Sequence, residues 1–340
     1  MDKILLKQIL REYDNKRTQA ILNAKQRKFE LLQVNPTLSE IEKELANISI
    51  KTSLALLNSD DITKEKLLKD LSKQNSKLIK EKNIILKKLS KSSDYLLPRF
   101  ECKTCEDTGY VDENGKSVIC NCLKQKIFDI YYNKSNIGNL EKENFSTFNT
   151  RIFSTKANPE LYKSEISPRE NMELLREKAE SFIENFDDPN EKNLLFTGNT
   201  GLGKTFLTNC IAKSMLERGK TVLYQTAPIM FDTIIDEKFG KDNIDIINNI
   251  YNVDLLIIDD LGTEKVNDMK IAELFTIINT RSLNQNHKNT KTIISTNLTI
   301  EELFKVYTNR IGSRLVGNYR FLRFFGDDLR FKKNINNQEF

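Results

Sequence analysis

The chain has 340 residues, of which 39% are hydrophobic and 30% charged, and its formal net charge is +5. This length allows two domains, one with a large core, and no run approaches the ~18 apolar residues of a membrane helix. The N-terminus becomes charged too early for a secretory signal, and five cysteines in a reducing compartment do not indicate a disulfide framework. We therefore expect a cytoplasmic protein that has no membrane partner.

The positive charge is concentrated at the start of the chain. Residues 1–95 carry 20 Lys and Arg against 13 Asp and Glu. Such a region either approaches DNA or an acidic protein surface, or is the solvated surface of helices in a Lys-rich chain. The charge alone favours the solvated surface.

Apolar residues recur at helical spacing through residues 1–97, for example Leu71, Leu78 and Ile85 at heptad spacing. No glycine occurs before Gly109, which favours continuous helices. We predict an N-terminal all-α helical domain over residues 1–97, built as a bundle or a long hairpin. Its apolar seam either binds a partner or closes a self-contained bundle, and the sequence favours neither alternative.

A cysteine-rich segment follows at residues 98–125, with the pattern C-x2-C-x14-C-x-C. Paired cysteines supply thiolates in the tetrahedral arrangement that Zn²⁺ prefers, and four of them leave no position for a reactive water. Glycines between the pairs indicate a hairpin. We predict a small structural zinc site with four cysteine ligands, and the alternative is four free thiols. The ligands would be Cys102, Cys105, Cys120 and Cys122.

Residues 126–170 are predicted to form a connector, and residues 171–340 alternate strand-like and helix-like patterns. This alternation is typical of a parallel α/β sheet flanked by helices. The predicted strands are residues 193–197, 221–225, 254–259, 290–296 and a short one near 321–325.

The first of these strands runs into the sequence G-x-x-x-x-G-K-T, a P-loop, and a helical pattern follows it. In such loops the backbone N–H groups and the helix N-terminus surround the phosphates. Lys204 is expected to contact the β- and γ-phosphates, and Thr205 to ligate Mg²⁺. The predicted nucleotide-binding residues are Gly198, Asn199, Thr200, Gly201, Leu202, Gly203, Lys204 and Thr205.

A second apolar strand ends in Asp259 and Asp260, which is the form of a Walker B motif. Asp259 is expected to hold Mg²⁺ beside the P-loop, and Asp260 to orient the attacking water. Taken alone, the same residues would also suit a turn after the strand. Asn297 follows a third strand, where it either contacts the γ-phosphate or caps the next helix, a task that Thr299 can also perform.

Three arginines near the C-terminal end are candidates for contacts with phosphate. Arg310 and Arg314 are four residues apart and share a helix face, and either could complete the site of a neighbouring subunit or form surface salt bridges. Arg330 is expected to serve the nucleotide bound by its own chain.

From about Phe145 to Arg330 the sequence resembles the AAA+ ATPase domain of bacterial replicative-helicase loaders, the DnaC/DnaI family, and the related IstB-type proteins. The resemblance is carried by the P-loop, the Walker B strand with its Asp-Asp pair, residues 294–298 and residues 310–315. It implies that Asn297 is sensor 1, that Arg310 or Arg314 is an arginine finger, and that Arg330 is sensor 2. It also implies a spiral oligomer with nucleotide between subunits.

The resemblance predicts an Mg²⁺-dependent ATPase that loads a replicative, DnaB-type helicase onto single-stranded DNA. Its cofactors would be ATP, Mg²⁺ and Zn²⁺. Single-stranded DNA would be held through its backbone, with Lys265 and Lys270 as weak candidates that also suit a solvated helix. Two alternatives remain: an IstB-like transposition helper acting on duplex DNA, and an ATP-switched adaptor whose hydrolysis is incidental.

Overall fold

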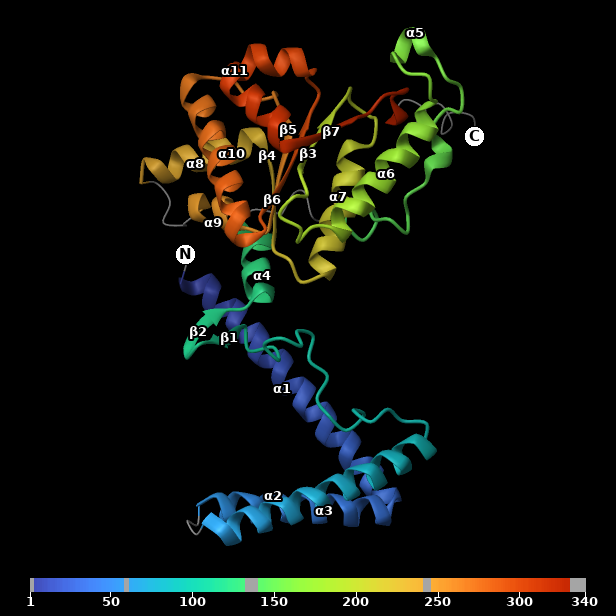
Figure 1. The fold of residues 1–340 in the computed structure, drawn as a ribbon, viewed down its shortest axis with the longest axis vertical. Coiled ribbons are helices and arrows are strands. Elements are labelled where there is room, and N and C mark those ends of the chain that lie inside the picture. Colours follow the sequence, from blue (N-terminus) through green and yellow to red (C-terminus); the bar gives the residue numbers. More distant parts are fainter. Residues whose placement is uncertain (1–2, 58–60, 132–139, 241–245, 331–340) are drawn as a thin grey trace. The chain divides into compact units, whose positions relative to one another are not determined.

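The computed structural model describes residues 3–57, 61–131, 140–240 and 246–330 (Figure 1). The parts of the predicted domains at residues 1–2, 58–60, 132–139, 241–245 and 331–340 lie outside the described residues. Contacts divide the chain into two units, residues 7–118 and residues 119–340 with 1–6. No helix in the described ranges is both long and apolar enough to cross a membrane.

Three long helices form most of the first unit: α1 (Lys3–Val34), α2 (Pro36–Leu57) and α3 (Asp61–Lys88). The side chain of Asn35 accepts a hydrogen bond from the Leu38 backbone at 3.0 Å, so Asn35 separates α1 from α2 as a helix cap. Glu42 of α2 binds Lys28 of α1 and Lys82 of α3. Burial would raise the pKa of Glu42, but the hydrogen bonds from both lysines outweigh it and lower that pKa.

A two-stranded hairpin, β1 (Tyr110–Glu113) and β2 (Lys116–Ile119), follows the helices. Its turn is Asn114-Gly115, and both residues have positive φ, 55° and 80°. Asparagine and glycine tolerate this conformation, which matches the twist of the two strands. The hairpin predicted between the cysteine pairs is therefore present, and α4 (Asn121–Tyr131) begins directly after it.

The second unit contains a five-stranded parallel sheet in the order β4-β5-β6-β3-β7. Its strands are β3 (Asn193–Thr197), β4 (Val222–Thr226), β5 (Leu255–Leu261), β6 (Lys291–Thr296) and β7 (Tyr319–Arg323). All five strands predicted from the sequence are present, with ends shifted by at most two residues. Because β3 lies between β6 and β7, the P-loop that follows it begins between the ends of two neighbouring strands.

Helices cover both faces of this sheet (Figure 1). One face carries α6 (Pro168–Glu184) and α7 (Lys204–Glu217). The other carries α8 (Ala227–Lys238), α9 (Ile246–Asn252), α10 (Asp268–Lys288) and α11 (Ile300–Asn318). The short helices η2 (Thr150–Ile152) and α5 (Pro159–Tyr162) precede α6. Phe153, from the predicted connector, is buried in the core beneath α6 and α7.

The predicted fold class is confirmed: a helix-flanked parallel α/β sheet that follows an N-terminal helical region. The nearly continuous apolar run of β5 explains why this strand was recognisable, since strands covered on both faces need apolar residues at successive positions.

Candidate nucleotide and metal sites

The P-loop connects β3 to α7, and its glycines have backbone angles that other residues rarely adopt. Gly198 and Gly201 have φ of 141° and 73°. A Cβ atom on Gly198 would lie 2.3 Å from the Phe324 carbonyl oxygen, and one on Gly201 would lie 1.8 Å from Asp328 Oδ1. Gly198 therefore requires glycine both for conformation and for space, whereas at Gly201 the positive φ favours glycine and the Asp328 side chain would have to move.

Lys204, the first residue of α7, is buried, and its ammonium group points back into the loop. It donates hydrogen bonds to the carbonyls of Gly198 at 2.5 Å and Asn199 at 2.7 Å, and to Asn297 Oδ1 at 2.7 Å. Burial lowers the pKa of Lys204, while the charges of Asp260 and Asp259 oppose this shift. The lysine thus joins the P-loop to the end of β6.

Asp259 lies near the end of β5 and is 4% exposed. Its Oδ2 accepts a hydrogen bond from the Tyr224 hydroxyl at 2.6 Å and lies 3.5 Å from Thr205 Oγ1. Its Oδ1 accepts from the Ser295 hydroxyl and from the Asp260 backbone N–H. This carboxylate is therefore fixed beside the first turn of α7, where an alcohol and a carboxylate offer the oxygen ligands that Mg²⁺ prefers.

Asp260 adopts a left-handed conformation with φ of 55°. An aspartate tolerates this region better than most residues, and such backbone angles cluster at functional sites. Its carbonyl accepts hydrogen bonds from the backbone and hydroxyl of Thr263. Burial raises the pKa of Asp260, the charge of Asp259 adds to the rise, and Lys204 and Arg330 oppose it.

The start of α11 decides between the two possible roles of Asn297, a contact with phosphate or a helix cap. Thr299 caps this helix: its side chain accepts from the Glu302 backbone at 3.2 Å, and Glu302 reciprocates at 2.8 Å. This is a complete capping box. Asn297 therefore does not cap α11, and its amide oxygen accepts from Lys204 instead.

Arg330 is exposed, but its charge lowers the pKa of both Lys204 and Asp260. The segment that carries it lies against the P-loop, since the Leu329 backbone donates to the Gly201 carbonyl at 3.1 Å. The structure thus brings Arg330 toward the same site as the P-loop and both aspartates.

Arg310 and Arg314 lie on α11, whose helical path is interrupted at Thr308, with φ of 73°. Arg314 is half-buried, donates to Asn279 Oδ1 at 3.3 Å and lies 4.3 Å above the Phe275 ring. Arg310 is exposed. Neither side chain has a contact with the P-loop or the aspartates within the described residues.

Tyr224 and Ser295 are the site residues that the sequence patterns missed. They lie on β4 and β6, on either side of β5. Tyr224 is 1% exposed and also belongs to the core beneath α6 and α7, so its pattern is that of an ordinary core aromatic. Only the register of the three strands places both hydroxyls on Asp259.

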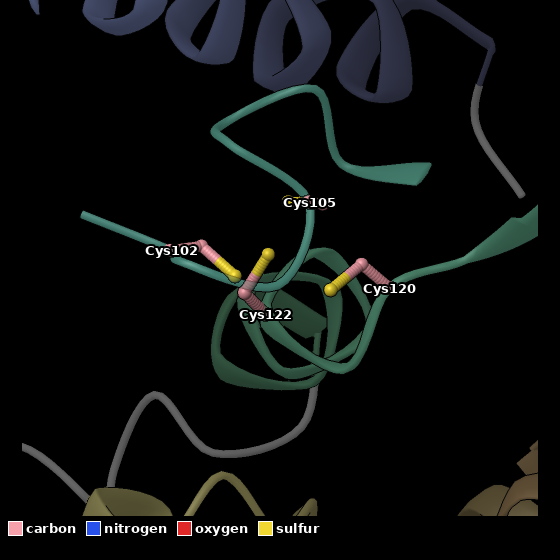
Figure 2. Close-up of side chains that lie close together, drawn as sticks. All are labelled: Cys102, Cys105, Cys120 and Cys122. Atoms are coloured by element: carbon pink, nitrogen blue, oxygen red, sulfur yellow. The ribbon is translucent and has the colours of Figure 1, made fainter. Parts of the chain in front are cut away.

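The four predicted zinc ligands form a cluster around the hairpin. The sulfur atoms of Cys102, Cys105, Cys120 and Cys122 all lie within 4.8 Å of one another (Figure 2). Four Zn–S bonds of about 2.3 Å in a tetrahedron would place the sulfurs roughly 3.8 Å apart. The cluster is near this spacing, and four thiols fit a closed zinc site.

Backbone hydrogen bonds support the first cysteine pair. The Gly109 N–H donates to Cys105 Sγ at 3.3 Å. Asp107 is 3% exposed and accepts from the backbones of Glu101 and Cys102 at 3.0 and 2.8 Å. The pattern of cysteines did not indicate this role for Asp107, which shapes the loop that presents Cys102 and Cys105.

Comparison with known proteins relates the ATPase-like part of the chain to a described family. The family "IstB-like ATP binding protein" matches residues 166–335. The chain is 30% identical over 156 residues to the replicative helicase loader DnaC of Escherichia coli strain K12. It is 27% identical over 143 residues to the putative insertion sequence ATP-binding protein y4pL of Sinorhizobium fredii.

These matches are partial. The DnaC alignment covers 45% of this chain and 62% of the relative, and the y4pL alignment covers 41% and 56%. A crystal structure of the DnaC helicase loader aligns with a TM-score of 0.44 at 21% identity, over 55% of this chain and 99% of that one.

Proposed function

Because the chain belongs to the family of IstB-like ATP-binding proteins, we propose that it is an ATPase that loads a replicative DNA helicase onto single-stranded DNA. ATP binding assembles the loader with the helicase, and hydrolysis releases it. The observation that carries this proposal is the group formed by Lys204, Asp259, Asp260 and Asn297 at one edge of the sheet. These are the groups that phosphoryl transfer to water requires.

Each residue has a role that its position supports. The P-loop backbone binds the phosphates, and Lys204 turns from the loop carbonyls toward the β- and γ-phosphates. Thr205 and Asp259 would hold Mg²⁺, which screens the phosphate charges. Asp260 orients the attacking water, and Asn297 contacts the γ-phosphate. A raised pKa suits Asp260 to accept a proton or a hydrogen bond from that water.

Arginines complete the site in two ways under this proposal. Arg330 contacts the nucleotide of its own chain, which its electrostatic effect on Lys204 and Asp260 supports. Arg310 is the finger offered to a neighbouring subunit, since its side chain is exposed while that of Arg314 is occupied by Asn279 and Phe275. Self-association is therefore part of the proposed mechanism.

The helical unit is proposed to bind the helicase. Its core is small, centred on Leu38, Leu86 and Leu96, and it leaves large apolar side chains exposed. We propose that the helicase buries these side chains on binding, since protein partners cover exposed apolar surface. The side chains that are more than half exposed include Leu22, Phe29, Val34, Ile50, Leu54, Ile84 and Leu97.

The second candidate is a transposition helper, favoured by the likeness to the insertion sequence protein y4pL. The two functions share the nucleotide site and differ in partner. The long helical unit and the cysteine cluster, which precede the ATPase-like part, favour the loader, because a helper that acts through the ATPase alone does not need them.

Affinity capture from a lysate of the host tests the proposal. Tagged wild-type protein with ATP and Mg²⁺ is expected to retain the replicative helicase, and Lys204→Ala to retain much less, because it loses the charge that binds the phosphates. Mass spectrometry identifies the partner. Capture of a transposase would favour the helper, and capture of neither would contradict both functions.

A further inference from the structure

The most tightly fixed group at the candidate site is the carboxylate of Asp259. Four hydrogen-bond donors face its two oxygens: the hydroxyls of Tyr224 and Thr205 on Oδ2, and the Ser295 hydroxyl with the Asp260 N–H on Oδ1. A buried carboxylate that accepts several hydrogen bonds is held in its orientation.

The donors come from both neighbouring strands of the sheet. Asp259 pairs in register with Thr226 of β4, so Tyr224, two residues earlier, projects from the same face. On β6, Ser295 shares that face with Ile293, since both positions alternate with the opposite-facing Ile294. The two hydroxyls therefore approach the carboxylate from opposite sides and fix its plane.

We propose that Tyr224 and Ser295 are positioning residues that hold the Asp259 carboxylate in the orientation needed to bind Mg²⁺ together with the nucleotide. This inference rests on the proposed ATP-binding function. Without the two hydroxyls the carboxylate would rotate about its Cβ–Cγ bond, and its Oδ2 would no longer face Thr205. Hydrogen-bond partners that orient a metal ligand in this way contribute about 10–100-fold to metal affinity.

Tyr224 is suited to the task because its hydroxyl donates to Asp259 Oδ2 at 2.6 Å. Its ring packs in the core beneath α6 and α7, which restricts the hydroxyl to one place. Replacement by phenylalanine keeps this ring and removes only the donor.

The test is the Mg²⁺ dependence of nucleotide binding, followed by fluorescence of an N-methylanthraniloyl-ATP at increasing free Mg²⁺. We expect Tyr224→Phe to raise the half-saturating Mg²⁺ concentration about 10-fold. Nucleotide binding in EDTA is expected to stay within about twofold of wild type, because the P-loop contacts are intact. Ser295→Ala is a second, smaller change that is expected to shift the same midpoint in the same direction.

Tyr307→Phe is the matched control. Tyr307 is also fully buried and also donates to a buried carboxylate, that of Glu264, but it belongs to α11 on the other face of the sheet. Its loss is expected to lower thermal stability without moving the Mg²⁺ midpoint. If Tyr307→Phe raised the half-saturating Mg²⁺ concentration as much as Tyr224→Phe does, the effect would come from general destabilisation. That result would overturn the inference.

The remaining outcomes separate this inference from the proposed function. If wild-type protein binds nucleotide in a Mg²⁺-dependent manner but Tyr224→Phe and Ser295→Ala keep its midpoint, the positioning role is wrong and the proposed function stands. If the wild type shows no Mg²⁺-dependent binding, both are wrong.

Discussion

Arg310 and Arg314 are equivalent candidates in the sequence, but their side chains differ in contacts and in exposure. They share a helix face and a charge, but Arg314 is engaged by Asn279 and by the Phe275 ring, whereas Arg310 is exposed. An arginine that acts on the nucleotide of a neighbouring subunit must be free to reach it. The structure therefore supports assigning different tasks to the two side chains.

We expect Arg310→Ala to lower kcat of the assembled ATPase by about 10³-fold or more, the effect of removing an arginine finger. Nucleotide affinity of the isolated chain should be retained, since Arg310 has no contact with the P-loop within the described residues. Steady-state ATPase assays with helicase and single-stranded DNA measure the rate.

Arg314→Ala is the comparison variant. It removes a cation–π contact worth about 1–2 kcal/mol, so we expect a fall in Tm of roughly 2–8 °C instead of a large loss of kcat. A loss of activity in Arg314→Ala with an unchanged Tm, alongside full activity in Arg310→Ala, would reverse the assignment.

At the same scale, the P-loop and the Asp259-Asp260 pair were predictable because phosphate and Mg²⁺ chemistry restrict which residues can serve. Tyr224 and Ser295 were not, because a tyrosine or a serine in a buried strand has no pattern of its own. Their contribution depends on the order β4-β5-β6, which no local stretch of sequence specifies.

At the scale of elements, the strands were the most predictable part of the fold and the arrangement of the strands was the least. The apolar run of β5 identifies a buried strand by itself. Long-range pairing decides that β3 lies between β6 and β7. The hairpin β1–β2 lies between these cases: Asn114-Gly115 predicts its turn, and the cysteine pairs on both sides predicted where it lies.

The cysteine cluster gives a prediction for this element. We expect metal analysis of the purified protein to find one zinc per chain, and Cys105→Ser to lose it, because three thiolates and a hydroxyl bind Zn²⁺ less well. Since structural zinc contributes directly to folding, loss of metal should expose the segment around residues 98–125 to proteolysis.

Cys210→Ser is the matched control for zinc, because Cys210 is buried in α7 and is not part of the four-sulfur cluster. It should retain one zinc per chain. A folded wild-type protein free of metal, with four thiols that react with a thiol reagent under native conditions, would contradict the zinc site.

At the scale of the whole molecule, the chain joins a helical unit with a small core to an α/β unit with a large one. Phosphate chemistry belongs to the second unit and the exposed apolar side chains of α1, α2 and α3 belong to the first. This division suits a protein in which nucleotide controls the grip on a partner. The replicative helicase is proposed as that partner through resemblance, because a helical surface carries no chemical signature comparable to a P-loop.

The most direct test is reconstituted loading of the purified host helicase onto circular single-stranded DNA, scored by unwinding of an annealed oligonucleotide. We predict that wild-type protein with ATP and Mg²⁺ accelerates unwinding at least about tenfold over helicase alone, and that Lys204→Ala does not. Equal unwinding with wild type, with Lys204→Ala and with helicase alone would contradict the loader function.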